Sequence, residues 1–81
     1  MSEWTPSPYR DYRWIIRDDR LLGGKFAVRD TRLSVAFVLG CISEGMSADE
    51  ISATYGEFPR EAIAEIMKLS SELVDSANVA A

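Results

Sequence analysis

The chain lacks histidine and has almost no cysteine, and these two shortages exclude several kinds of catalytic site. Its 81 residues include no histidine and one cysteine, Cys41. A Cys–His nucleophile, a histidine general base and a histidine-bound metal each need a missing residue, and a single cysteine cannot form an internal disulfide. No glycine-rich phosphate-binding loop is present either. We therefore expect no enzyme activity, no metal, no cofactor and no small-molecule substrate, and we interpret Cys41 as a small buried residue.

Long apolar runs are missing as well. No run approaches the roughly 20 residues that a membrane-spanning helix needs. Residues 1–15 do not have the pattern of a signal peptide, so we expect a cytoplasmic protein without membrane contact. The 47% apolar and 27% charged residues are typical of a soluble globular chain. A chain of this length forms one small domain, whose modest core makes self-association or a partner a reasonable expectation.

Charge is distributed unevenly along the chain. Residues 1–33 hold seven of the nine basic residues and five acids, a net charge of +2. Residues 34–81 hold two basic residues and eight acids, a net charge of −6, so the two parts add up to the −4 of the whole chain. An acidic chain is a poor general binder of polyanions, but its basic part is able to meet phosphates or an acidic protein.

Residues 1–11 are expected to form an extended N-terminal arm, because they contain two prolines and show no apolar periodicity. Trp4 and Tyr9 are large side chains for such a segment. Two interpretations stay open. These aromatic residues cover an edge of their own domain, or they become ordered against a partner.

A short antiparallel hairpin is expected next. Residues 12–17 alternate in the manner of a strand and are rich in β-branched and aromatic residues. One face of this strand is predicted to carry Tyr12, Trp14 and Ile16. Gly23 and Gly24 permit a tight reversal, since glycine adopts positive φ without strain. Residues 25–28 alternate at period two and are predicted to return antiparallel to the first strand.

Three helices are expected after the hairpin. Ser34 is a plausible N-cap for the first helix, which then ends at Gly45, a residue suited to the left-handed conformation that follows a helix. Ser47 and Glu50 stand at the spacing of a capping box and begin the second helix. Pro59 suits the first turn of the third helix. The chain is therefore predicted to be mainly α, with an arm and a hairpin followed by a three-helix, helix-turn-helix-like bundle.

The third helix is predicted to bury one apolar stripe. The residues of that stripe are Ile63, Ile66, Met67, Ser70, Leu73 and Val74. Ala62 and Leu69 lie off the stripe and form a second apolar edge, which is a candidate contact for a homodimer. We take residues 12–76 as the single folded domain and residues 77–81 as a C-terminal tail.

Four segments resemble, in order and spacing, the motifs of a known prokaryotic family. They read Gly23-Gly24-Lys25, Asp30-Thr31-Arg32-Leu33-Ser34-Val35, Gly45-Met46-Ser47-Ala48-Asp49-Glu50-Ile51 and Tyr55-Gly56-Glu57-Phe58-Pro59-Arg60-Glu61-Ala62-Ile63. The family is domain-of-unknown-function family 433, which includes VapB-like antitoxins. The chain departs from the family pattern where proline is usual, at Phe26, Ser34 and Gly56. It also carries Asp30 where the family usually has glycine.

The resemblance implies a helix-turn-helix-like domain of homeodomain-like type, commonly dimeric. It also implies the role of antitoxin in a toxin–antitoxin pair whose toxin is a PIN-like ribonuclease, with operator DNA as a further ligand. The structural motif residues that the resemblance supplies are Gly23, Gly24, Thr31, Arg32, Gly45 and Ser47. Among these, we interpret Arg32 as a bridge between the hairpin and the first helix.

Contact with the toxin is expected at the aromatic, arginine-rich segment near the N-terminus. PIN-like nucleases hold a divalent metal with a cluster of carboxylates. An antitoxin is able to block that cleft by presenting an arginine to the carboxylates or by covering the cleft with an arm. The predicted contact residues are Trp4, Tyr9, Arg10, Tyr12, Arg13 and Arg17.

The alternative function is that of a DNA-binding repressor that uses its basic hairpin. The third helix is a poor reader of DNA, since it offers Arg60 among several acids, and each acid opposes the counterion release that drives non-specific affinity. A two-stranded ribbon is able to enter a major groove. The candidate DNA contacts are Lys25, Arg29, Arg32 and Arg60. A third interpretation is a solvated strand face whose arginines pair with nearby acids.

Overall fold

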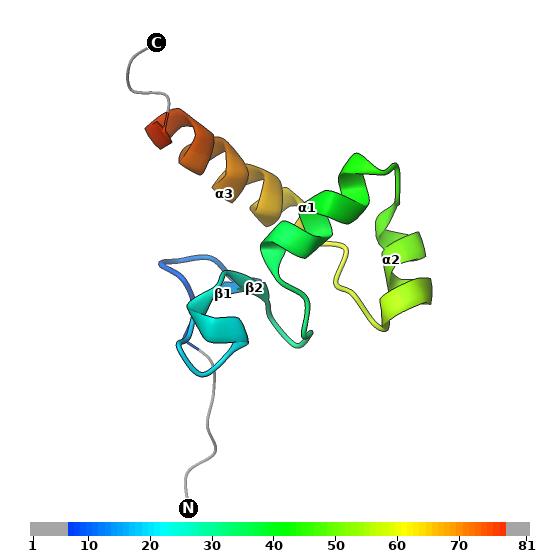
Figure 1. The fold of residues 1–81 in the computed structure, drawn as a ribbon, viewed down its shortest axis with the longest axis horizontal. Coiled ribbons are helices and arrows are strands. Elements are labelled where there is room, and N and C mark those ends of the chain that lie inside the picture. The colour runs from blue at the N-terminus through cyan, green and yellow to red at the C-terminus, as the bar shows by residue number, and fades with distance from the viewer. Residues whose placement is uncertain (1–6, 78–81) are drawn as a thin grey trace, which may run out of the picture.

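Short β-structure comes first along the chain, and helices follow it. The structure is a computed structural model and describes residues 7–77. Within those residues an antiparallel two-stranded hairpin precedes three α-helices (Figure 1), which confirms the expected mainly α fold. The elements are β1 (Ile15–Ile16), the 3₁₀ turn η1 (Leu22–Gly24), β2 (Ala27–Val28), α1 (Val35–Ser43), α2 (Ala48–Tyr55) and α3 (Ala62–Ala77).

The hairpin is short, and neighbouring segments extend it on both sides. The register places Ile15 opposite Val28 and Ile16 opposite Ala27. Pro8 forms a further antiparallel bridge to Ile16, and Ser34 forms one to Ala27. Residues 7–9, which the sequence assigns to the arm, therefore lie along one edge of the hairpin. The residues that lead into α1 close the other edge.

The first strand is shorter than residues 12–17, and its predicted facing is wrong. Ile15 and Ile16 are both fully buried, although they point to opposite faces. Ile15 belongs to the main core, whereas Ile16 lies outside it and lines a groove with Leu21 and Leu33. Alternation fails here because the loops around a two-residue strand cover its second face. The second strand is likewise reduced from residues 25–28 to Ala27–Val28.

The reversal between the strands is tight, as the glycine pair predicts. Leu22, Gly23 and Gly24 have φ angles of 51°, 66° and 83°, so three successive residues are left-handed. Such a conformation costs a residue with a side chain roughly 1–2 kcal/mol, and glycine avoids that cost. A Cβ atom on Gly24 would also lie 3.1 Å from Oδ1 of Asp19. Both glycines are therefore required by the backbone at this turn.

The predicted ends of α1 and the predicted start of α2 are confirmed by the structure. The Ser34 hydroxyl accepts the backbone N–H of Phe37 at 3.0 Å at the start of α1. Ser47 and Glu50 form a complete capping box at the start of α2. Gly45 has a φ of 92° and follows the last residues of α1 in the left-handed conformation.

The third helix begins later than predicted and is rotated relative to the predicted stripe. It starts at Ala62 rather than at Pro59, because two 3₁₀-type bonds turn the chain first, from Ala62 N to Pro59 O and from Ile63 N to Arg60 O. Its fully buried residues are Ala62, Ile66 and Leu69. Two of these, Ala62 and Leu69, are the edge predicted to contact a second copy, and that prediction is wrong because the edge faces the core.

Three residues of the predicted inner stripe of α3 are instead exposed. Met67, Leu73 and Val74 keep 40%, 46% and 68% of their surface accessible. Leu73 lines a groove together with Gly24 and Leu39, whereas the last turns of α3, red in Figure 1, extend beyond the hairpin and α1 and have little of the chain to cover them. Helical periodicity identifies the apolar positions of α3 but does not identify which of them the rest of the molecule covers.

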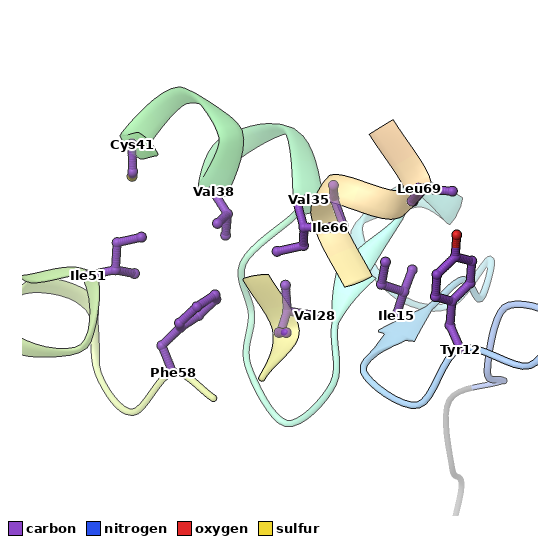
Figure 2. Packing of buried hydrophobic residues seen from close by; sticks show 11 residues of the cluster. Tyr12, Ile15, Val28, Val35, Val38, Cys41, Ile51, Phe58, Ile66 and Leu69 are labelled. Atoms are coloured by element: carbon purple, nitrogen blue, oxygen red, sulfur yellow. The ribbon is translucent and has the colours of Figure 1, made fainter. Parts of the chain in front are cut away.

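One apolar cluster joins the hairpin to all three helices. Figure 2 shows it extending from Cys41 and Ile51 at one end, past Val28 and Ile66, to Tyr12 at the other. Cys41 is buried, as predicted. Among the described residues, no helix is both long and apolar enough to cross a membrane.

Candidate interaction surface

Three arginines near the N-terminus lie over aromatic rings. The guanidinium carbon of Arg10 is 5.1 Å from the ring centre of Tyr9, that of Arg13 is 5.5 Å from Trp14, and that of Arg17 is 4.9 Å from Phe26. All three side chains are exposed. No ion pair joins any of them to a carboxylate within residues 7–77. The rings hold the guanidinium groups in place by cation–π attraction without neutralising their charge.

The backbone and neighbouring groups fix these arginines further. Nε of Arg17 donates a hydrogen bond to the carbonyl oxygen of Gly24 at 3.0 Å, which ties the first strand to the reversal. Arg10 adopts a φ of 51° in a turn that the N–H of Tyr12 closes by bonding to the carbonyl of Tyr9 at 3.0 Å. A left-handed arginine is uncommon and places the Arg10 side chain at a corner of the chain.

Tyr9 and Tyr12, which are predicted to contact the toxin, pack against their own domain, whereas the arginines are exposed. Tyr9 packs edge-on against Phe26, with ring centres 4.7 Å apart, so it covers an edge of its own domain. Tyr12 is buried in the core, and its hydroxyl donates a hydrogen bond to the Glu72 carboxylate. In this conformation Tyr12 has no surface to offer a partner. Trp4, the sixth predicted contact residue, lies outside the described residues.

Burial raises the pKa of Tyr12 to about 12, and the hydrogen bond to Glu72 and the negative charge of that carboxylate raise it as well. Figure 2 shows the Tyr12 ring at the end of the core beside Leu69 of α3. The ammonium of Lys68 lies 5.7 Å from the centre of the same ring. Tyr12 is therefore a buried, neutral link between the arginine-bearing segment and α3.

Glu65 on α3 holds the same segment, and sequence analysis did not assign it that role. Its two carboxylate oxygens accept the backbone N–H groups of Arg13, at 2.9 Å, and Trp14, at 2.6 Å. The sequence does contain a signal for this arrangement. Glu65 and Glu72 are seven residues apart, and so lie two turns apart on one face of a helix.

The residues predicted to contact DNA do not form one surface. Lys25 and Arg32 line a shallow groove of about 470 Å³ together with Leu22 and Phe37. Arg29 is partly buried beside the hairpin, where its backbone N–H bonds to the carbonyl of Trp14 at 2.8 Å. The fourth residue, in the turn before α3, is Arg60, whose Nε lies 4.0 Å from a carboxylate oxygen of Asp49 at the start of α2.

The predicted role of Arg32 as a bridge between the hairpin and α1 stays a prediction, and Arg32 lines one groove with Lys25 and Phe37. Its side chain is exposed and makes no hydrogen bond or ion pair with another residue of the described range. Thr31 fixes this corner. The Thr31 hydroxyl donates to the carbonyl of Val28 at 2.8 Å and accepts the N–H of Leu33 at 3.0 Å.

Asp30 stands at the tip of the same corner, where the family pattern has glycine. Its φ is 63°, in the left-handed region. This angle explains the usual glycine, because glycine reaches it without strain and aspartate is among the few other residues that tolerate it. The replacement therefore keeps the backbone of the corner and adds an exposed carboxylate there.

The helical part of the molecule is acidic where α3 begins. The start of α3 is flanked by exposed Glu57 and Glu61, and Arg60 between them is already close to Asp49. One side of α3 is occupied by the hairpin through Glu65 and the buried Ile66. Across the described part of the chain, no three Cys, Asp or Glu side chains cluster in a way that would hold a metal ion.

A comparison with known proteins gave one match. The family model described as "Protein of unknown function (DUF433)" matches residues 15–68. No curated protein and no solved structure is significantly similar to the chain. The matched residues run from β1 to the middle of α3 and include the reversal, the Asp30 corner and the capping box.

Proposed function

Because the chain belongs to the DUF433 family, whose description gives no function, its role must be inferred from its own surface, and we propose that it is an antitoxin-like protein. It acts in the cytoplasm, has no catalytic activity, and neutralises a PIN-like ribonuclease by direct binding. The contact residues are Arg10 and Arg13, which precede β1, and Arg17, which follows it. The resemblance of its motifs to a family that includes VapB-like antitoxins supports the identity of the partner.

One observation carries the proposal: Arg10, Arg13 and Arg17 are exposed, positioned over rings and without a carboxylate partner within residues 7–77. A guanidinium group binds a carboxylate with two parallel hydrogen bonds, and such charge-assisted bonds are about twice as strong as neutral ones. Side chains that are held in place before binding lose less conformational entropy when they bind. This arrangement suits an acidic cleft such as the metal site of a PIN-like ribonuclease.

Charge reversal at Arg10 and Arg13 tests the proposal. The double variant Arg10→Glu/Arg13→Glu should bind the proposed PIN-like ribonuclease more than about tenfold less tightly, since a hydrogen bond to a charged group contributes roughly 1.5–3 kcal/mol. The measurements are the dissociation constant by calorimetry and RNA cleavage in the presence of each variant.

A control is Arg60→Glu, which reverses one positive charge, against two in the double variant, in the turn before α3. It should leave both binding and inhibition unchanged. Equal inhibition by the Arg10→Glu/Arg13→Glu variant and the unmodified protein would overturn the proposal. Circular dichroism of each variant checks that the fold is intact.

A deletion that tests the contribution of the N-terminal segment to toxin binding has to leave the folded domain intact. Removing residues 1–12 would delete Tyr12 from the core together with Pro8 from the hairpin edge. Deleting residues 1–6 instead keeps all of these contacts and removes Trp4. If Trp4 contacts the toxin, this shorter deletion weakens inhibition, and circular dichroism of the free protein checks that it is folded.

A second candidate function is DNA binding by the hairpin. The observation in its favour is that Lys25 and Arg32 line one groove and form no ion pair within the described residues. The positions of the other two candidates argue against DNA binding, because neither Arg29 nor Arg60 lines the groove of Lys25 and Arg32. A DNA-binding repressor should show operator affinity that falls steeply with salt, with a slope near the number of phosphates contacted. Lack of a gel shift at low salt would leave protein binding as the function.

A further inference from the structure

We propose that a groove between the glycine reversal, α1 and α3 binds the anion of a medium-chain fatty acid, with its carboxylate at Arg17 and Lys25 and its acyl chain along Leu39 and Leu73. The groove has a volume of about 450 Å³, within the range of about 300–1,000 Å³ that is usual for small-molecule sites. The acid is a ligand here and not a substrate. Binding of such an acid goes beyond the proposed antitoxin function and does not depend on it.

Two cations line the groove beside the reversal. The guanidinium of Arg17 lies over the ring of Phe26, and its Nε donates a hydrogen bond to the carbonyl of Gly24, so the group is held in place. The two terminal nitrogens of Arg17 remain as donors, and a planar guanidinium binds a carboxylate with parallel hydrogen bonds. Lys25 adds a second exposed cation. Within residues 7–77, no carboxylate lines the groove or forms an ion pair with either cation, so their charge is available to an anion.

The rest of the groove is largely apolar. Val35 and Leu39 of α1 line it together with Leu73 of α3 and Phe26 of the hairpin. Leu73 keeps 46% of its surface accessible in the free protein. An acyl chain beside Leu73 would remove part of this apolar surface from water, which favours binding.

This lining favours a fatty acid over other small anions. Among the described residues, Phe26 is the aromatic side chain that lines the groove, and its ring already contacts Arg17 and Tyr9. It therefore offers little surface on which a nucleotide base could stack. An inorganic anion such as phosphate would leave the apolar part of the groove uncovered. A ligand with a carboxylate at one end and an apolar chain behind it matches both parts.

Isothermal titration calorimetry with octanoate, at concentrations below those at which it forms micelles, tests the proposal. Octanol has the same apolar chain without the charge, and it should bind more than about tenfold less tightly than octanoate. NMR spectra recorded during the titration should show amide shifts at lining residues such as Lys25, Ala36 and Leu39.

A pair of variants locates the carboxylate of the ligand. Lys25→Glu should raise the dissociation constant for octanoate by more than about tenfold, because it replaces a cation of the groove with an acid. Arg32→Glu is the matched control. It makes the same change of charge at an exposed residue that shares the neighbouring groove with Lys25 but does not line this one. It should change the dissociation constant by less than about twofold, since solvent and salt screen a more distant charge.

A second pair locates the acyl chain. Leu73→Asp should also raise the dissociation constant by more than about tenfold, since it removes an apolar contact and places a like charge in the groove. Val74→Asp adds the same charge one residue later, at a position outside the lining, and should have little effect. Arg17 stays unmodified in all four variants because it is also a proposed toxin contact, so octanoate binding and toxin binding are tested at different residues. Thermal melts establish that each variant is folded.

Octanoate that produces neither heat nor amide shifts would overturn the proposal, as would octanol that binds as tightly as octanoate. Equal effects of Lys25→Glu and Arg32→Glu, or of Leu73→Asp and Val74→Asp, would also overturn it. Binding to vesicles of phosphatidylglycerol without binding of free octanoate would assign the groove to a membrane surface instead.

Discussion

The hairpin half of the molecule (residues 7–34) and the helical half (residues 35–77) use their charges in opposite ways. In the helical half, acids serve the fold: Glu50 closes a capping box, while Glu65 and Glu72 accept hydrogen bonds from the hairpin. In the hairpin half, Arg13 and Arg17 lie on aromatic rings and keep their charge unpaired within the described residues. The comparison places the charge available to a partner in the hairpin half.

The two halves also differ in how their backbones are held. The helices satisfy their own hydrogen bonds, and their caps complete the ends. The hairpin has two paired residues in each strand and takes further bonds from residues 7–9, from Ser34 and from Glu65. A lone hairpin is marginal in water. The half that presents the arginines therefore depends on the half that does not.

Removal of the Glu65 carboxylate should lower the free energy of unfolding more than the other substitutions below, because it ends the support that α3 gives to the hairpin. Glu65→Ala leaves the N–H groups of Arg13 and Trp14 without their partner, so we expect the free energy of unfolding to fall by about 2 kcal/mol. Urea denaturation measures the change in the free energy of unfolding. Amide exchange at Arg13 and Trp14 shows whether the hairpin opens before the helices. Glu61→Ala removes the same charge from an exposed position and should be nearly neutral. Equal effects of the two substitutions would contradict the role of Glu65.

The hydrogen bond between Tyr12 and Glu72, which joins the two halves, should make the free energy of unfolding depend on pH. The folded pKa of Tyr12, about 12, lies above the unfolded value of about 10. The stability from this shift is therefore fully present below about pH 10 and is lost as pH rises toward 12. Tyr12→Phe should cost about 1 kcal/mol at neutral pH, through the lost hydrogen bond, and should flatten the decline between pH 10 and 12.

The control for Tyr12→Phe is Tyr55→Phe, since Tyr55 is exposed. Urea denaturation at neutral pH and near pH 11 measures both variants. If Tyr55→Phe flattened the decline as much as Tyr12→Phe, the alkaline loss of stability would have another source.

The smallest change in the free energy of unfolding is expected for substitutions of Asp30, which test the strain of its left-handed backbone conformation. Asp30→Gly should raise the free energy of unfolding by about 0.5 kcal/mol, because relief of the left-handed strain exceeds the extra entropy of a glycine in the unfolded chain. Asp30→Val should lower it, since a β-branched residue tolerates this φ poorly. Thermal melts compare the three proteins. Destabilisation by Asp30→Gly would show that the aspartate side chain itself supports the corner.

Local signals in the sequence were sufficient for both ends of α1, for the start of α2 and for the reversal. Ser34, Ser47 and Gly45 act within one turn of the chain, so their spacing determines their role. The burial of α3 was not predictable in this way. Whether Leu69 or Met67 faces inward depends on where the hairpin docks, and that contact joins segments more than fifty residues apart, as in the bond from Arg13 to Glu65.

The candidate surface was predictable in composition but not in arrangement. Counting basic residues identified the hairpin half as the positive part of the chain. Sequence spacing did not show that Arg17 would cross to the ring of Phe26, or that Tyr12 would turn inward to α3. It also grouped Arg60 with Lys25, although the structure brings Arg60 to Asp49 and Lys25 to the groove beside α1.

The bridges from Pro8 and Ser34 to the hairpin have a consequence for how a partner is recognised. Pro8 covers the outer edge of β1 and has no N–H of its own, while the chain at Ser34 turns directly into a helix beside β2. Within residues 7–77, neither side of the small sheet therefore presents a row of free amides and carbonyls. We therefore expect that no partner binds by adding a strand to β1 or β2, and that the same closure protects these two strands from edge-to-edge aggregation. Recognition has to be made by side chains.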